Sequence, residues 1–132
     1  MIYRVGEAIF PVAATPANER SPVLSPDGQS IAWVSDGSGR DEVYMKKLED
    51  QADARQLTNT GGVEPVWSRQ GLLYREGDRM MRDGSTVFEG RFEKDPGANA
   101  ADYDVDPGGK FFVMLKSGGR PKEIRVIRNW AP

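Results

Sequence analysis

A short turn motif that recurs along the chain constrains the fold more than any other feature. The motif is Ser25-Pro26-Asp27-Gly28, and its counterparts are 68–71 (SRQG) and 106–109 (DPGG), 43 and then 38 residues further on. Proline fixes the first corner of such a turn, aspartate bonds its own backbone and glycine accepts a positive φ. The corresponding turn residues are Ser68 and Gly71, then Asp106 and Gly109. Repetition at this spacing indicates similar units stacked side by side.

The strand after the first turn is apolar on both of its faces. Residues 30–35 read SIAWVS, which places Ile31 and Trp33 on one side and Ala32 and Val34 on the other. A strand with one face in water alternates apolar with polar residues, so this strand needs cover on both faces. Similar apolar runs follow the other two turns, at 72–74 and 111–115.

The number of strands in each unit identifies the architecture. A short strand precedes each turn, a second follows it, and third strands are predicted over 42–46, 79–81 and 123–127. Fourth strands are predicted in only two units, over 54–58 and 85–88. Four strands at a period near 40 residues are typical of a β-propeller blade. We expect one all-β domain, with N-terminal closing strands in 1–15 and three blades of antiparallel strands at about 20–60, 61–100 and 101–132.

The first unit also resembles the TolB-type (WD-like) propeller repeat. The resemblance lies in 22–35 (PVLSPDGQSIAWVS), 42–44 (EVY) and 55–58 (RQLT). The second unit keeps Pro65-Val66-Trp67-Ser68 but has Arg69-Gln70 in place of Pro-Asp. The stretch 72–130 is similar to the last blades of bacterial TolB-like propellers. The resemblance implies a propeller fold, but no particular activity, because the family serves many roles.

Three blades cannot close a ring, since propellers have about four to eight. An open arc would leave an apolar blade face at each end. The segment 8–14, which contains Ile9, Phe10 and Val12, takes the place of an outer strand, and the third unit stops one strand short. We therefore expect a homodimer that forms one six-bladed ring, in which each N-terminal strand completes the partner's third blade. Residues 2–4 have no place in this count, and the alternative is a piece of a longer propeller.

Composition excludes several classes of function. The chain has no cysteine and no histidine, so disulfides, thiol nucleophiles and imidazole bases are absent. A net charge of −2 gives no general argument for nucleic acid, and no apolar run approaches the ~20 residues of a membrane span. We expect a protein that is not an enzyme and uses no cofactor; a carboxylate-only hydrolase or lyase is the enzymatic alternative. Without a signal peptide it is expected in the cytoplasm, or in the periplasm if an export signal was removed.

Candidate binding residues follow from aligning the three turns. Ser21, Glu64 and Asp102 then open the innermost strand of each blade, and Asp104 lies further along the third. Because innermost strands line the channel of a propeller, these side chains are candidates for a channel-mouth site. Converging carboxylates favour Ca²⁺, Mg²⁺ or a cationic peptide, while a solvated polar lining needs no ligand. The preferred function is a scaffold that binds a protein or peptide, with a small ligand or metal ion in the channel as the alternative.

Two other residue groups receive structural interpretations. The acidic residues beside glycines lack the spacing of a calcium loop, so turn formation and backbone capping account for them: Asp27, Asp36, Asp41 and Glu42. The tryptophans lie in or next to apolar strands, which predicts a place in the core between blades: Trp33, Trp67 and Trp130.

Overall fold

The computed structural model is all-β throughout the part of the chain that it describes. That part comprises residues 16–48, 54–92, 101–106, 108, 110–115 and 123–128, together with the backbone of 2–5 and 8–11. No helix of the length and apolarity needed to cross a membrane occurs among these residues.

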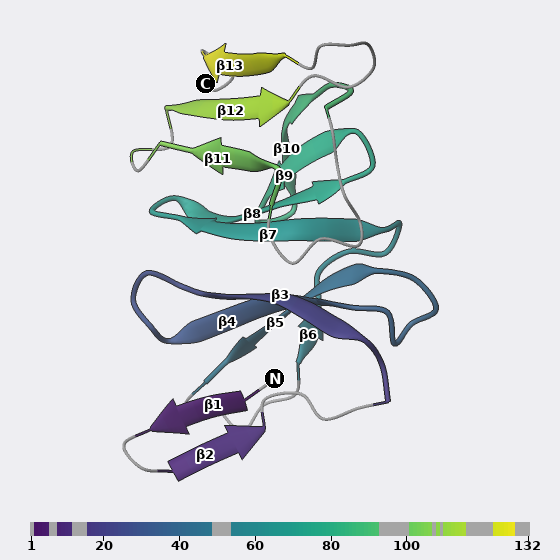
Figure 1. Cartoon of the computed structure of the whole chain (residues 1–132), viewed down its shortest axis with the longest axis vertical. Coiled ribbons are helices and arrows are strands. Elements are labelled where there is room, and N and C mark those ends of the chain that lie inside the picture. Colours follow the sequence, from purple (N-terminus) through teal and green to yellow (C-terminus); the bar gives the residue numbers. More distant parts are fainter. Residues whose placement is uncertain are drawn as a thin grey trace.

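Three antiparallel sheets, which we call the first, second and third blades, make up most of the chain. Their strand orders follow the sequence from the inner to the outer strand. The first blade contains β3 (Glu19–Leu24), β4 (Ser30–Ser35), β5 (Glu42–Lys47) and β6 (Arg55–Gln56). The second contains β7 (Gly62–Ser68), β8 (Gly71–Glu76), β9 (Arg79–Arg82) and β10 (Ser85–Glu89). The third contains β11 (Tyr103–Val105), β12 (Phe111–Leu115) and β13 (Ile124–Arg128). Figure 1 shows the blades fanning out from β3, β7 and β11.

The third blade has one strand fewer than the other two among the described residues. β13 is the last strand in its sheet, so its outer edge is not paired there. β1 (Ile2–Val5) and β2 (Ala8–Pro11) instead form a separate two-stranded antiparallel sheet. The strand for which the sequence offered no place is thus paired with the expected closing strand. Ile9 and Phe10 belong to β2, whereas Val12 lies outside the described residues.

The turn between β3 and β4 is closed by its own side chains. The Gly28 N–H donates to the Ser25 carbonyl at 2.9 Å, and Gly28 has a φ of 73°. Asp27 accepts hydrogen bonds from the Ser25 hydroxyl and from the Gln29 N–H. These bonds lower the pKa of Asp27. Pro26 stands at the corner of this turn and is exposed.

The two later turns use different chemistry at the same place. Ser68 Oγ accepts from the Gln70 N–H at 3.1 Å and donates to the Gly71 carbonyl, so two residues connect β7 and β8. In the third turn the Asp106 carboxylate accepts from the N–H groups of Gly108, Lys110 and Phe111. Gly109 lies outside the described residues.

Each pair of neighbouring blades encloses its own apolar core. Between the first and second blades the buried residues are Ala32, Val34, Val43, Leu72, Tyr74 and Met81. Between the second and third they are Leu73, Met80, Tyr103, Phe112 and Met114. Leu72 and Leu73 are neighbours in β8 and face opposite cores, because side chains alternate along a strand. The second blade is therefore buried on both faces, as its sequence predicts.

Tryptophan joins the first two blades through more than apolar contact. Trp67 packs against the core between them, and its indole N–H donates to the Val23 carbonyl of β3 at 3.1 Å. Trp33 is 2 % exposed and stacks on Tyr44 of the adjacent strand, with the ring centroids 6.0 Å apart. Trp130 lies outside the described residues.

Candidate functional site

The inner strands of the first two blades share a backbone irregularity at the predicted site. Ser21 and Glu64 have φ values of 56° and 57°, in the left-handed region that side-chain-bearing residues seldom adopt. Each lies where the register with the next strand shifts, between Arg20 and Val23 in one blade and between Val63 and Val66 in the other. Both residues are buried. The bulge turns these side chains into the protein.

Glu64 forms a buried ion pair within the second blade, on the side that faces the third blade. Its Oε2 lies 3.3 Å from Nη1 of Arg75, and the two side chains are only 3 % and 2 % exposed. The Asp102 N–H donates to Oε1 of Glu64 at 3.2 Å, while Nη2 of Arg75 donates to the Phe92 carbonyl at 2.9 Å. Burial raises the pKa of Glu64, and Arg75 and the Asp102 N–H oppose that rise. The carboxylate is thus engaged in joining two blades.

Tyr103 completes this junction, although sequence analysis predicts only a strand position for it. Its hydroxyl donates to the Glu64 backbone carbonyl at 2.8 Å. Burial, reinforced by the negative charge of Glu64, raises the pKa of Tyr103 well above its ordinary value. The other two units have proline at the equivalent position, Pro22 and Pro65. This difference is the sequence signal that could have identified Tyr103 as a residue with a separate role.

Of the acidic residues of the third blade, Asp102 lies beside Glu64, whose pKa is raised by burial and further by the Asp102 charge, whereas Asp104 faces away. Asp104 is exposed, and its carboxylate accepts the N–H of Val105 at 2.8 Å. It lies on the opposite face of β11 from Tyr103, while half-buried Asp102 approaches Glu64 through its backbone. Among the described residues, no group of three or more acidic side chains is arranged to hold a metal ion. The channel-mouth site remains a prediction for Ser21, Glu64, Asp102 and Asp104.

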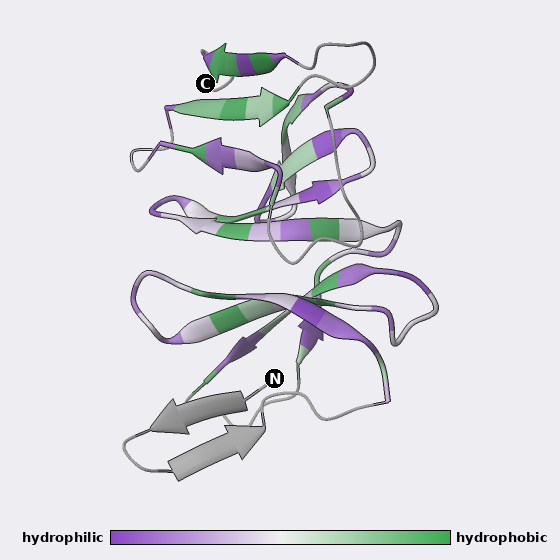
Figure 2. Ribbon diagram, viewed as in Figure 1, coloured by the Kyte–Doolittle hydropathy of each residue, from purple (hydrophilic) through white to green (hydrophobic). Residues whose placement is uncertain are grey.

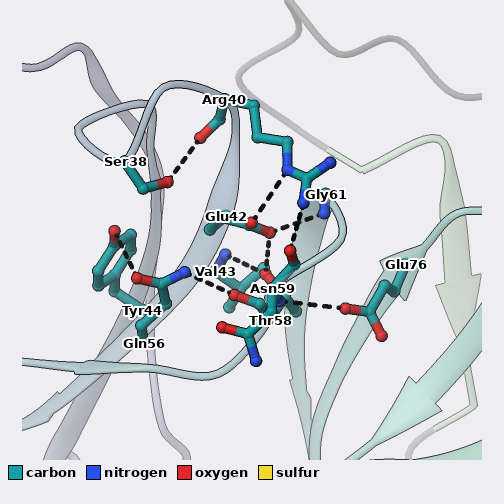
Figure 3. Close-up of polar contacts among 10 residues, drawn as sticks. All are labelled: Ser38, Arg40, Glu42, Val43, Tyr44, Gln56, Thr58, Asn59, Gly61 and Glu76. Atoms are coloured by element: carbon teal, nitrogen blue, oxygen red, sulfur yellow. Dashed lines mark hydrogen bonds and ion pairs between the residues drawn. The ribbon is translucent and has the colours of Figure 1, made fainter.

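A second polar network holds the crossover from the first blade to the second (Figure 3). Glu42 is 2 % exposed, and its Oε1 accepts from the Thr58 hydroxyl at 2.7 Å and from the Gly61 N–H at 2.8 Å. Nε of Arg40 lies 3.3 Å from its other oxygen. The Thr58 hydroxyl in turn accepts the N–H of Val43 at 2.9 Å. The interpretation of Glu42 as a backbone-capping residue is confirmed, and its near-complete burial makes the network structural.

Gly62 is packed so closely against this network that a methyl group has no room. A Cβ atom there would lie 2.3 Å from Oγ1 of Thr58, whose two hydrogen bonds fix its position. We expect Gly62→Ala to lower the free energy of unfolding by about 1–3 kcal/mol, the usual cost of overpacking. Urea denaturation followed by circular dichroism measures this loss. Gly37→Ala is the control, because its nearest neighbour would be the Ala17 Cβ at 3.3 Å; an equal loss in both variants would contradict the steric explanation.

The outward face of the third blade is apolar and exposed. Tyr103, Phe112 and Met114 belong to the core against the second blade, so the alternate residues along the strands face away from it. Ile124 and Val126 on this outer face are 70 % and 50 % exposed. Further members of the face are Asp104, Phe111, Val113 and Leu115, with Arg128 over the Phe111 ring at 5.5 Å. Apolar residues along β12 and β13 are visible in Figure 2.

A hollow of about 250 Å³ lies in this outward face. Its lining includes Asp104 on one side and the apolar side chains of Val113, Leu115 and Ile124 on the other. An apolar surface that is hollowed in this way resembles one half of a core between blades more than a site for a polar ligand.

The first blade also carries an exposed apolar residue on the face that points away from the second blade. Val23 packs against the core between these two blades, so its neighbour Leu24 faces the other way and is 55 % exposed. Leu24, Ile124 and Val126 are the large apolar residues that are exposed in the described part of the chain. All three therefore lie on the two terminal faces of the stack.

Comparison with known proteins supports the fold. No protein-family model matches the chain, and no curated protein matches its sequence. Among solved structures, the chain is similar to the crystal structure of TolB from Acinetobacter baumannii, with a TM-score of 0.62 and 18 % sequence identity. The match covers 92 % of this chain and 32 % of TolB, so the chain spans about a third of that protein's length. At this identity the likeness shows the fold alone: the three sheets are blades of a TolB-like β-propeller.

Proposed function

We propose that the protein is a non-enzymatic scaffold that binds a protein or peptide, and that it works as a ring closed by two copies of the chain. One observation carries the proposal: the terminal faces of the three-blade stack bear the exposed large apolar side chains of the described residues, Leu24, Ile124 and Val126. Each internal blade face is buried against a neighbour. Exposed apolar surface of this kind marks an interaction site.

A second copy supplies the number of blades that a ring needs. Two chains contribute six blades, within the range of about four to eight found in propellers. Among the described residues, the outer edge of β13 is not paired, so it offers backbone groups to an additional strand. In the proposed ring this strand comes from the N-terminal segment of the partner, whose β2 would leave its hairpin or carry β1 with it.

The binding role is proposed because the buried carboxylates of the described residues are used within the fold. The buried carboxylates Glu42 and Glu64 are held by hydrogen bonds and ion pairs within the fold, and we assign them no chemistry on a substrate. The loops at the blade ends and the channel mouth are the proposed surface for a protein or peptide. Loops on a rigid scaffold are where binding residues gather in many folds.

Light scattering after size exclusion tests the assembly. We expect a mass of twice 14.6 kDa at micromolar concentration. Val126→Arg places a charge on the half-exposed outer face and is expected to raise the dimer dissociation constant at least ~10-fold, about 1.4 kcal/mol. Its circular dichroism should match the parent, since Val126 is outside both cores. A monomer for the parent chain would contradict the proposed ring.

A peptide library displayed on phage tests the binding role. The parent protein is expected to enrich related sequences, and the Val126→Arg variant to lose them if the completed ring forms the binding surface. Enrichment of no consensus by a well-folded dimer would contradict the scaffold role while leaving the assembly intact.

A further inference from the structure

We propose that the third blade of one copy packs on the first-blade face that bears the exposed Leu24 in a second copy. In this arrangement Leu24 lies over the hollow beside Asp104. The inference rests on the proposed ring, and it specifies which surfaces meet and in which register.

The register comes from matching strand pairs in the first two blades. Leu24 pairs with Ile31 as Trp67 pairs with Leu72. Trp33 pairs with Tyr44 as Tyr74 pairs with Met81. The set Trp67, Leu72, Tyr74 and Met81 is the surface by which the second blade packs on the first. Its counterpart in the first blade is Leu24, Ile31, Trp33 and Tyr44. Ile31 and Trp33 are already buried within the single chain, so Leu24 is the member of this set that offers exposed apolar surface.

Strand pairs also show that the third blade has the kind of surface on which a following blade packs. The first blade receives the second with a face that includes the pairs Val23 with Ala32 and Val34 with Val43. The corresponding pairs in the third blade are Asp104 with Val113 and Leu115 with Ile124. All four of these third-blade residues line the hollow. The outward face of the third blade is therefore the same kind of surface, without an occupant in the described chain.

The contact made by Trp67 places Leu24 in the proposed interface. The Trp67 indole lies over β3 and donates to the carbonyl of Val23, which corresponds to Asp104 in the third blade. Leu24 has the position of Trp67 in its own blade, so it reaches Asp104 of the copy on which it packs. Two such contacts, related by a twofold axis, use both terminal faces of both chains and leave neither free to extend a filament.

Chemical cross-linking tests this register directly, because the chain has no cysteine of its own. The variant with both Leu24→Cys and Asp104→Cys is treated with a short bismaleimide at micromolar protein concentration and run on a denaturing gel. We expect most of it to become a covalent dimer. Matched controls are the two single variants and the pair Leu24→Cys with Asp78→Cys, because Asp78 is exposed in the turn after β8 of the second blade; all three should remain as single chains.

The outcomes separate this inference from the proposed function. A monomer by light scattering contradicts the ring itself. A dimer that fails to cross-link through the double variant contradicts the register proposed here but leaves dimerisation in place. Covalent dimer from Val126→Cys alone would show that two third blades face each other, which also contradicts it. Circular dichroism of each variant verifies that it is folded before the reaction.

Discussion

Arg75→Met is expected to lower the free energy of unfolding by about 3–5 kcal/mol at neutral pH. The guanidinium of Arg75 lies 3.3 Å from the Glu64 carboxylate with both groups almost wholly buried. Removing one partner of a buried pair leaves the other charge without compensation, which has a cost of that size. Methionine keeps most of the side-chain volume, so the loss reflects charge. Urea denaturation at pH 7 gives the value.

The pH dependence distinguishes lost charge from lost packing in this variant. The pKa of Glu64 is already raised by burial above its ordinary 4.5, and Arg75 opposes that rise. Without Arg75 the pKa rises further, so the folded variant binds a proton that the unfolded chain releases at neutral pH. Its stability therefore falls as pH rises through the raised pKa, and the deficit against the parent shrinks toward pH 4.5. A deficit that does not change with pH would contradict the electrostatic explanation.

A matched control for Arg75→Met is available at the next strand. Arg79 pairs with Glu76 three residues before it at 3.3 Å, but its side chain is 40 % exposed. Pairs of this kind contribute little, so Arg79→Met should change the free energy of unfolding by less than about 1 kcal/mol. The double variant Glu64→Gln with Arg75→Met should be more stable at neutral pH than Arg75→Met alone, because the unpaired Glu64 charge is then absent.

Phe112→Ala is expected to cost about 3–5 kcal/mol of stability and to loosen the third blade. Phe112 is buried in the core between the second and third blades, with its ring edge-on to Phe88 at 5.1 Å. Truncating a buried aromatic side chain loses transfer free energy and leaves a cavity. Phe112→Leu fills most of that volume and should cost far less. Hydrogen exchange should locate the loosening in β11 and β12, and uniform loss of protection across the first blade would contradict this assignment.

Much of the fold was readable in the sequence because its signals are local and repeated. The turn at Ser25 combines proline, aspartate and glycine, and the apolar run at 111–115 is continuous, so the boundaries of the strands followed. The doubly buried strand β8 was predicted for the same reason. The sequence also predicted the N-terminal strand pair, which β1 and β2 form; counting repeats then assigned its second strand to a blade and left no place for the first.

The candidate site was harder to predict, because it depends on side-chain contacts between residues of different strands. Alignment of the turns correctly brought Ser21 and Glu64 to equivalent positions, which share the same left-handed backbone. It could not show that the side chain of Glu64 meets Arg75, since that pair joins residues of β7 and β8 across a bulge. The sequence did contain one sign of a buried ion pair, because a charged residue, Arg75, directly follows the apolar run 72–74.

The bulges at Ser21 and Glu64 also protect the repeat against mispairing during folding. A slip of one residue between β3 and β4 would exchange the two sides of the sheet, because side chains alternate. An extra residue at a fixed point matches its partner strand in only one alignment. The sequences of the repeats can therefore differ while each blade still presents the correct face to its neighbour. Trp67, for example, has in the second blade the position that Leu24 has in the first.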